Sequence, residues 1–295
     1  MIDFTNCKVN KFKGYGGANG NKINILYNSE SYMLKFPPTP SKSKMMSYTN
    51  GCISEYLACH IFASLGFVTQ ETILGKYTDK KGKEKIVVAC KDFTADGKHL
   101  MEFAQLKNTC VDSEQNGYGT ELSSILQAID EQALIEPQLL KEFFWQMFIA
   151  DALLGNFDRH NGNWGILVDE PNQSAKIAPI YDCGSCLFPQ LDHKKMTDVI
   201  NDEKEINQRV YVFPTSAIVE DGKKIAYYDY ISSLKSEDCN KALLEITKRI
   251  NLDKINCIID ETEAISDLQK DFYKIMIAER KSKILDYSLT KLLNQ

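Results

Sequence analysis

The sequence has no run of about 18 apolar residues, and residues 1–6 show no basic segment followed by an apolar one. We therefore expect neither a transmembrane helix nor the usual secretory signal peptide, and the sequence alone favours a cytoplasmic protein. The nine cysteines are odd in number and irregularly spaced, which favours reduced thiols over a disulfide framework. The net charge of −5 argues against a surface that binds nucleic acid.

Arginine is scarce. Of the 35 basic residues only four are arginine: Arg159, Arg209, Arg249 and Arg280. Arg159 lies in a polar segment described below, and lysine does not replace a planar guanidinium that must brace a loop through several hydrogen bonds. We expect Arg159 to hold that loop rather than to contact a substrate.

The 295 residues allow one large domain or two modest ones. The charge is uneven, because the first 50 residues carry seven lysines against Asp3 and Glu30. A basic, glycine-rich start before an acidic remainder suits an anionic small ligand such as a nucleotide. A solvated, lysine-rich surface is the alternative interpretation of the charge.

The first 92 residues predict strands and one helix. Residues 28–30 mark a tight turn, and Gly66 is a candidate for the end of the helix. The expected strands are residues 23–27, 32–36, 69–77 and 84–90, and the expected helix is residues 47–65.

From about residue 94 the patterns become helical. Residues 139–154 are apolar around most of a helix and predict a buried central helix that ends at Gly155. Residues 164–168 and 176–180 predict a strand pair, helices follow beyond about 225, and the last helix is expected over 267–293. The expected class is α+β, with a small β-rich N-terminal lobe over 1–93 and a larger helical C-terminal lobe over 94–295.

The segment 155–165 concentrates an acid, a guanidinium, an imidazole and amides between a buried helix and a strand. A loop fixed at both ends can hold reactive side chains rigidly. The next strand is followed by Asp182 and then by Gly184, which permits a sharp turn.

These residues match the requirements of phosphoryl transfer, which uses one carboxylate to orient the attacking hydroxyl and accept its proton. A second carboxylate and an amide oxygen hold Mg²⁺, and a lysine with a glycine-rich loop binds the phosphates. Asp158 can be the first carboxylate, Asp182 and Asn163 the metal ligands, and Lys35 the phosphate lysine.

The glycine-rich segment 14–20 includes Gly14, Gly16 and Gly17, whose backbone amides could approach an anion closely. By itself it indicates a flexible turn, but its position before the hairpin that ends at Lys35 favours a phosphate loop.

Glu55 lies on a predicted helix that is apolar nearly all round. A buried carboxylate needs a partner, and Lys35 is the natural one. The alternative is a glutamate that faces solvent.

The order of glycine-rich loop, strand lysine, helix glutamate, Asp158-Arg159-His160-x-x-Asn163 and Asp182 resembles the HipA-like serine/threonine kinases. The Asp-Arg-His-x-x-Asn spacing is also similar to the phosphoinositide-3-kinase superfamily. Like the compact bacterial members, the chain has its glycine loop from residue 14, so the extra N-terminal subdomain of larger HipA proteins is not expected. The resemblance implies a two-lobed, protein-kinase-like fold.

The resemblance also implies ATP and Mg²⁺ as cofactors and a protein serine or threonine, including the chain itself, as acceptor. Asp158 would be the catalytic base, Asn163 and Asp182 would bind Mg²⁺, and Lys35 would contact the ATP phosphates. Residues 88–92 would form the hinge that meets adenine. The expected nucleotide-binding set is Gly14, Gly16, Gly17, Lys35, Glu55, Val88, Cys90 and Asp92.

Several interpretations stay open. The acceptor could instead be a small molecule or a phosphoinositide, or the chain could bind a nucleotide without turnover. His160 could be catalytic, contact a phosphate or anchor the loop, and Cys183 and Cys186 are either a zinc or redox pair or free thiols. Residues 227–230 predict a partly buried helix or a docking surface.

Partners and location follow from the same features. We expect a protein substrate, no direct nucleic-acid binding and no membrane insertion, while the resemblance leaves signal-less secretion or translocation into a host cell open. Thr39, Ser41 and Ser43 are candidate autophosphorylation sites.

Overall fold

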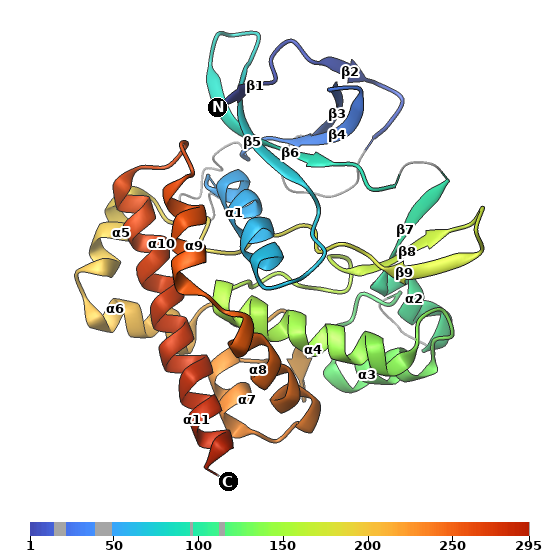
Figure 1. Cartoon of the computed structure of the whole chain (residues 1–295), viewed down its shortest axis with the longest axis vertical. Helices are drawn as coiled ribbons and strands as arrows, with labels where there is room; N and C mark the ends of the chain where they lie inside the picture. Colours follow the sequence, from blue (N-terminus) through green and yellow to red (C-terminus); the bar gives the residue numbers. More distant parts are fainter. Residues whose placement is uncertain (15–21, 39–48, 95–96, 112–115, 295) are drawn as a thin grey trace.

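The computed structural model describes residues 1–14, 22–38, 49–94, 97–111 and 116–294. Its N-terminal part carries a curled six-stranded sheet with the order β1-β5-β6-β4-β3-β2 (Figure 1). The strands are β1 (Ile2–Asp3), β2 (Lys8–Asn10), β3 (Lys22–Tyr27), β4 (Glu30–Lys35), β5 (Thr72–Thr78) and β6 (Glu84–Lys91).

The turn predicted after β3 is present. Asn28 and Ser29 connect β3 to β4 with φ values of 49° and 64°, the left-handed backbone that two-residue hairpin turns require. The register that follows pairs Lys22 with Lys35 and places Lys35 at the end of β4.

Helix α1 (Gly51–Ser64) lies below the sheet (Figure 1). It is shorter than the predicted helix, and residues 47 and 48 lie outside the described residues. Gly66, with φ of 90°, follows its last turn as expected. Buried residues lie on nearly every side of α1, and its core residues Leu57, Ile61 and Phe62 pack in the same core as the C-terminal helices.

The C-terminal part opens with β7 (Lys98–Glu102), α2 (Phe103–Cys110) and α3 (Leu122–Glu131). Helix α4 (Pro137–Leu154) then runs through the core and ends at Gly155, whose φ is 64°. This confirms the predicted central helix and its end. The predicted strand pair is also present, as β8 (Gly165–Asp169) and β9 (Ser174–Ile177) in the sheet β7-β8-β9.

The remaining residues are mainly helical, and the helices predicted beyond about residue 225 are present after a small hairpin at 219–224. In order they form α5 (His193–Ile200), α6 (Glu203–Asn207), the π-helical turn η2 (Gln208–Val212), β10 (Val219–Glu220), β11 (Lys223–Lys224), α7 (Tyr227–Ser233), α8 (Glu237–Arg249) and α9 (Leu252–Asp260), followed by α10 (Asp267–Arg280), the π-helical segment η3 (Lys281–Asp286) and α11 (Tyr287–Leu293). The predicted last helix over 267–293 is therefore interrupted by η3.

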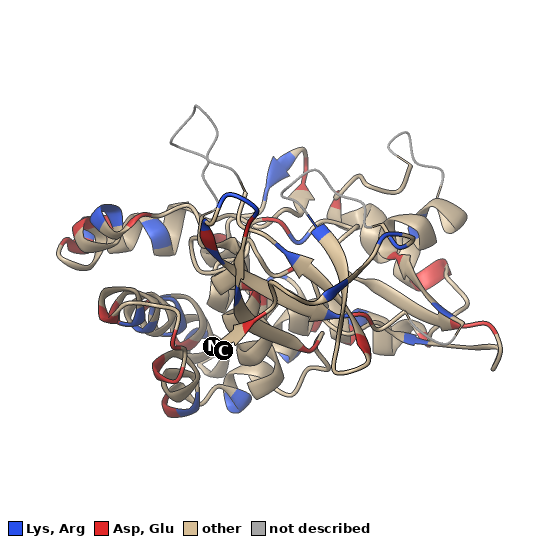
Figure 2. Ribbon diagram, turned by 90° about the horizontal axis from the view of Figure 1, so that it is seen from above, with Lys and Arg blue, Asp and Glu red and all other residues tan. Residues whose placement is uncertain are grey.

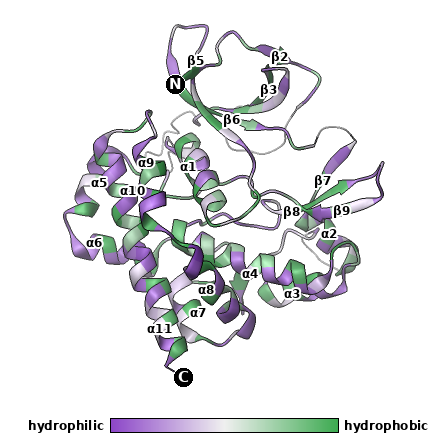
Figure 3. Cartoon of the chain, viewed as in Figure 1, coloured by the Kyte–Doolittle hydropathy of each residue, from purple (hydrophilic) through white to green (hydrophobic). Residues whose placement is uncertain are grey.

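The surface of this part is mixed in character. Hydrophilic residues alternate with hydrophobic ones along α5, α10 and α11 (Figure 3), and acidic and basic residues are interspersed (Figure 2). Tyr227 and Tyr230 of α7 are buried, which confirms the partly buried helix. Among the residues that the structure describes, no helix combines the length and the apolar character needed to cross a lipid bilayer.

Candidate active site

Lys35 joins the two parts of the molecule. Its Nζ lies 2.9 Å from Glu55 Oε2 on α1 and 2.8 Å from Asp182 Oδ1, which follows β9. Glu55 is 1% exposed, so the predicted buried Lys35–Glu55 pair is confirmed. Gly184 packs against the pair, because a Cβ at this residue would lie 3.3 Å from Glu55 Oε2.

The ion pair between Lys35 and Asp182 keeps both side chains charged. Attraction to Lys35 lowers the pKa of Asp182 to about 2, so the carboxylate is ionised near neutral pH. Burial alone would lower the pKa of Lys35, but Asp182 and Glu55 together raise it well above its usual value. The ammonium of Lys35 therefore stays charged although it is largely enclosed, while the Asp182 carboxylate beside it is partly open to the cleft.

Asp158 and Asn163 lie on the loop between α4 and β8. The Asn163 side chain donates from Nδ2 to the Asp158 backbone oxygen at 2.7 Å, which leaves the amide oxygen of Asn163 as its acceptor for a ligand. Burial raises the pKa of the Asp158 carboxyl, while His160 lowers it. Asp158 is thus a carboxylate whose pKa lies closer to neutral than that of an exposed aspartate, as suits a general base.

Arg159 braces the loop, as the sequence predicts. Its Nε lies 3.0 Å from Asp151 Oδ2 on α4, and its Nη1 donates to the backbone oxygens of Asn163 at 2.8 Å and Tyr181 at 2.7 Å. Arg159 is buried and does not line the cleft. The guanidinium of Arg159 therefore connects α4, the loop between α4 and β8, and Tyr181, the residue before Asp182.

His160 also has an anchoring contact. The Gly162 backbone N–H donates to His160 Nδ1 at 3.0 Å, which ties the imidazole to its own loop. The side chain still lines the cleft beside Asp158. This geometry favours the anchoring interpretation, and a contact with phosphate stays a prediction.

These side chains face one cleft of about 820 Å³ between the sheet and the helical part. Of the predicted site residues, those lining it are Gly14, Lys35, Glu55, Asp92, Asp158, His160, Asn163 and Asp182. Gly16 and Gly17 lie outside the described residues, as do Thr39, Ser41 and Ser43.

The predicted hinge needs a correction. Val88 and Cys90 are fully buried, and β6 pairs with β4 on one side and with β5 on the other at both residues. Their backbone groups are engaged in the sheet and cannot meet a ligand. Asp92 lines the cleft together with Phe93 and Thr94, so the connecting segment at the cleft is 92–94.

The side chain of Asp92 is also engaged. It forms an ion pair with Lys13 and accepts hydrogen bonds from Thr94, with the Thr94 Oγ1 at 2.6 Å. Lys13 precedes the glycine-rich segment, so the base of that segment is tied to the cleft-lining connection. Sequence reasoning missed this contact because 79 residues separate its two members.

Two further supports of the loop were missed. Asp151 is a buried acid within the apolar helix α4. An acidic residue in an apolar helix is expected to have a buried partner, so the sequence did contain a signal for this contact. Tyr227 donates its hydroxyl to the Asn156 backbone oxygen at 2.6 Å, a contact from a distant helix that no local pattern encodes.

The cysteines of the Cys-x-x-Cys motif, Cys183 and Cys186, are buried free thiols. Arg159 Nη2 lies 3.4 Å from Cys183 Sγ, so Cys183 belongs to the packing behind Asp182. Among the described residues, no group of three or more His, Cys, Asp or Glu side chains could hold a metal by itself. One carboxylate and one amide oxygen, at Asp182 and Asn163, instead fit Mg²⁺, which takes few protein ligands and completes its shell with phosphates and water.

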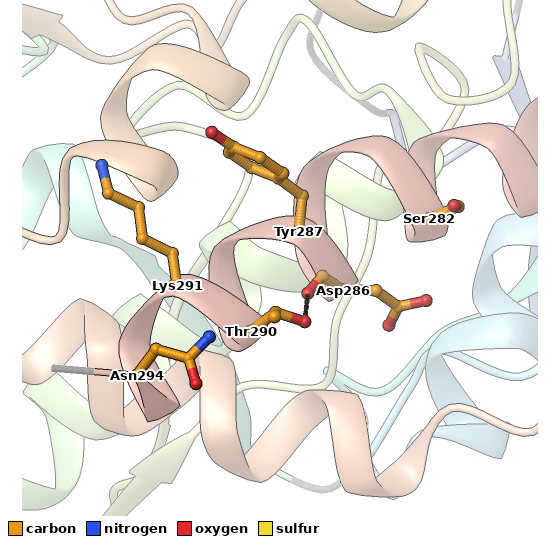
Figure 4. Close-up of a pocket in the computed structure, with 6 residues that line it drawn as sticks. All are labelled: Ser282, Asp286, Tyr287, Thr290, Lys291 and Asn294. Carbon is orange, nitrogen blue, oxygen red and sulfur yellow. Dashed lines mark hydrogen bonds between the residues drawn. The ribbon is translucent and has the colours of Figure 1, made fainter.

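A second hollow, of about 540 Å³, is lined by residues of η3, α11 and the residue that follows α11 (Figure 4). Its charged side chains are already engaged, since Lys281 pairs with Asp286 and Lys291 donates to the Ser232 backbone oxygen. It brings together none of the predicted site residues.

Comparison with known proteins identifies the family. The model of the HipA-like C-terminal domain matches residues 14–254. The chain belongs to the HipA-like C-terminal domain family. The predicted resemblance is thereby confirmed, and the match includes Lys35, Glu55, Asp158, Asn163, Asp182 and the helices through α8.

Individual relatives agree with this family. The chain is 54% identical over 291 residues, 98% of its length and 88% of the relative's, to the serine/threonine-protein kinase CtkA of Helicobacter pylori. The crystal structure of a Helicobacter pylori proinflammatory kinase CtkA matches with a TM-score of 0.93 at 53% identity, over 100% of this chain and 98% of that one. The predicted protein-kinase-like fold and the predicted enzyme class, a protein kinase, are both confirmed.

A more distant structure shares the fold alone. It is HipA of Shewanella oneidensis, solved with HipB and its operator DNA, with a TM-score of 0.56 and 15% identity over 93% of this chain and 66% of that one.

Proposed function

We propose that this HipA-like protein is an ATP- and Mg²⁺-dependent serine/threonine kinase that transfers the γ-phosphoryl group to protein hydroxyls, its own included. The observation that carries the proposal is Lys35, which bridges Glu55 and Asp182 at 2.9 and 2.8 Å in the cleft that Asp158 and Asn163 also line. Phosphoryl transfer requires a lysine held in place for the phosphates, a carboxylate to accept the proton of the acceptor, and a carboxylate and an amide to hold the metal.

The nucleotide would occupy the cleft with its phosphates toward Lys35. Gly14 lines this space, and the residues that follow it are the proposed phosphate loop. Phe93 and Thr94, which follow β6 and line the cleft, would contact the adenine base. Asn163 and Asp182 would hold Mg²⁺, which supplies charge neutralisation on the phosphates when bound.

Asp158 would act on the acceptor. Its carboxylate orients the acceptor hydroxyl and takes the proton as the hydroxyl oxygen forms a bond to the γ-phosphorus. The bond between that phosphorus and the β,γ-bridging oxygen breaks, and ADP leaves with the bonding pair. Arg159 would hold the loop at the geometry this step needs, because it donates to the backbone oxygens of Asn163 and Tyr181 while its guanidinium is held by the Asp151 carboxylate of α4.

Transfer of labelled phosphate from ATP in the presence of Mg²⁺ tests the proposal. We expect Asp158→Ala and Asp182→Ala to lose on the order of 10²–10⁴ in rate, and the exposed Asp198→Ala on α5 to act as an unaffected control. Full transfer by either cleft variant contradicts the mechanism.

The acceptor class is tested in the same assay. A generic protein, an inositol lipid and an aminoglycoside are offered in parallel, and we expect label on the protein and on the enzyme itself. Label on the lipid or the aminoglycoside alone contradicts the protein acceptor, and tight ATP binding without any transfer contradicts catalysis.

A further inference from the structure

The hairpin formed by β10 and β11 is attached to the loop that carries Asp158. Val219 donates its N–H to the Thr120 backbone oxygen at 2.9 Å, next to Gly119. The backbone oxygen of Gly119 in turn accepts from Asn161 Nδ2 of the catalytic loop at 2.8 Å. The β10 side of the hairpin is therefore linked to the catalytic loop through residues 119 and 120.

The β11 side is attached as well. The N–H of Ile225, which follows β11, donates to the Ile218 backbone oxygen at 2.9 Å, and two residues later Tyr227 donates its hydroxyl to Asn156 at 2.6 Å. Asn156 precedes Asp158 by two residues. Hydrogen bonds from both strands thus hold the open end of the hairpin beside the loop that carries Asp158.

Lys224 stands at this end of the hairpin and is exposed. It pairs in register with Val219, and it has no ion-pair partner among the described residues. The hydrogen bonds above attach the strand ends beside Lys224 to the catalytic loop, and the positive charge of Lys224 is among the influences that lower the pKa of Asp158 against the larger effect of burial. Of the acids on the hairpin, Glu220 is paired with Lys235, and Asp221 lies in the turn at the far end.

Val212 and Phe213 form an apolar ledge next to Phe157 of the catalytic loop. Val212 and Phe213 are 56% and 43% exposed, so two neighbouring large apolar side chains are open to solvent, and contiguous apolar surface of this kind can mark a contact site. The Phe213 ring centroid lies 5.6 Å from that of Phe157, the residue directly before Asp158. The ledge is therefore continuous with the catalytic loop.

We propose that Lys224 and the Val212–Phe213 ledge determine the acceptor sequence, by binding an acidic side chain and an apolar side chain that flank the acceptor hydroxyl in the substrate segment. The inference rests on the proposed kinase function and names its substrate class, a protein segment with an acidic residue and an apolar residue near the acceptor serine or threonine. A cation with no acidic partner in the part of the chain that the structure describes and an exposed apolar surface, both attached to the catalytic loop, are complementary to such a segment.

Synthetic peptides with a single serine test this inference. Three versions share one phenylalanine and differ only in their flanking residues, which are acidic, neutral amide or basic. We expect kcat/KM to be highest for the acidic peptide, by roughly fivefold over the neutral one, as befits a solvated charge pair. Lys224→Glu should reverse the order of the acidic and basic peptides and leave the KM for ATP unchanged.

The neighbouring residue supplies a matched control. Lys223→Glu makes the same charge change one residue away, and successive strand residues point to opposite faces, so it should keep the wild-type order. For the ledge, Phe213→Ala should raise the KM of the phenylalanine peptide and leave that of an otherwise identical alanine peptide unchanged.

Four results overturn the inference. The first is an equal rate of the wild type on all three peptides, and the second is an equal loss of rate on all three in Lys224→Glu, which would indicate that Lys224 acts on the transferred phosphate. The third is the same reversal of peptide order in Lys223→Glu. The fourth is no transfer to any peptide. Autophosphorylation measured in parallel separates the two proposals, because it persists if only the acceptor preference is wrong and is absent if the kinase function itself is wrong.

Discussion

At the scale of single residues, the site depends on charges that are buried together. Asp151 and Arg159 are both nearly inaccessible and lie 3.0 Å apart. Taking away one partner of such a pair leaves the other as an uncompensated charge in the interior, and that cost exceeds the net value of the intact pair.

We expect Asp151→Asn to lower the free energy of unfolding by about 3–5 kcal/mol. Urea denaturation measures this change. The control is Glu245→Gln, which removes an exposed pair with Lys248 and should cost no more than about 1 kcal/mol. Equal losses in the two variants would show that Arg159 is solvated rather than buried.

The pH dependence of catalysis also belongs to this scale. The base must be ionised, so activity is present above the pKa of Asp158 and is lost as the pH falls through it. Burial raises that pKa and His160 lowers it, so His160→Asn, which keeps an acceptor for the Gly162 N–H, should move the acid limb of kcat to higher pH.

A pH profile of kcat at saturating ATP measures the shift. An unmoved acid limb, or one displaced to lower pH, would contradict the assignment of Asp158 as the base. The control is His193→Asn at the start of α5, because this exposed histidine does not line the cleft.

At the scale of elements, strong local signals predicted the frame of the molecule. The two-residue turn at Asn28 and Ser29 and the end of α4 at Gly155 are set by short-range backbone preferences, and both are present. The pairing of Lys35 with Glu55 was also predictable, since a carboxylate in an apolar helix needs a cation.

Other elements depend on partners that the sequence does not reveal. The prediction of a hinge at Val88 and Cys90 was wrong because β6 pairs with a strand on each side, which engages the backbone groups of both residues. The sequence of β6 alone does not show that it has two neighbours. The hairpin β10–β11 has two residues in each strand, too few for an alternating pattern. Tyr227 reaches Asn156 only through the packing of α7 against the core.

The turn at Gly117 carries an element-scale prediction. Its φ is 80°, and a Cβ there would lie 1.8 Å from the Ala104 backbone oxygen. Gly117 also accepts a hydrogen bond from Asn161 Nδ2 at 2.9 Å. We expect Gly117→Ala to destabilise the protein and to lower kcat, because the clash displaces a backbone carbonyl that holds the catalytic loop.

Gly82→Ala is the matched control, since Gly82 has a similar φ of 76° and nothing within 4 Å of a Cβ. It carries the same backbone strain of about 1 kcal/mol without the clash. Thermal unfolding and the transfer assay on both variants separate strain from clash, and identical behaviour would contradict a role of the turn in the site.

At the scale of the whole molecule, the division into lobes at residues 93 and 94 stays a prediction. The hydrophobic core crosses this division. Leu57 and Phe62 of α1 belong to the same hydrophobic cluster as Phe148 of α4 and Phe272 of α10. Helix α1 precedes the division in sequence but packs with the helices that follow it. The sheet has its own smaller cluster around Ile25, Leu34 and Val87.

This shared core predicts that residues 1–93 do not fold alone and that the full chain unfolds in one transition. Burying α1 against the C-terminal helices removes apolar surface from water that an isolated N-terminal part would expose. Both tryptophans, Trp145 and Trp164, are buried in the C-terminal part, so their fluorescence reports that part alone, whereas far-UV circular dichroism reports the whole chain. Coincident urea transitions by the two probes, together with a disordered 1–93 fragment, are expected. Two separated transitions, or a folded fragment, would show that the lobes are independent domains and that α1 is held by the sheet rather than by the helices it contacts.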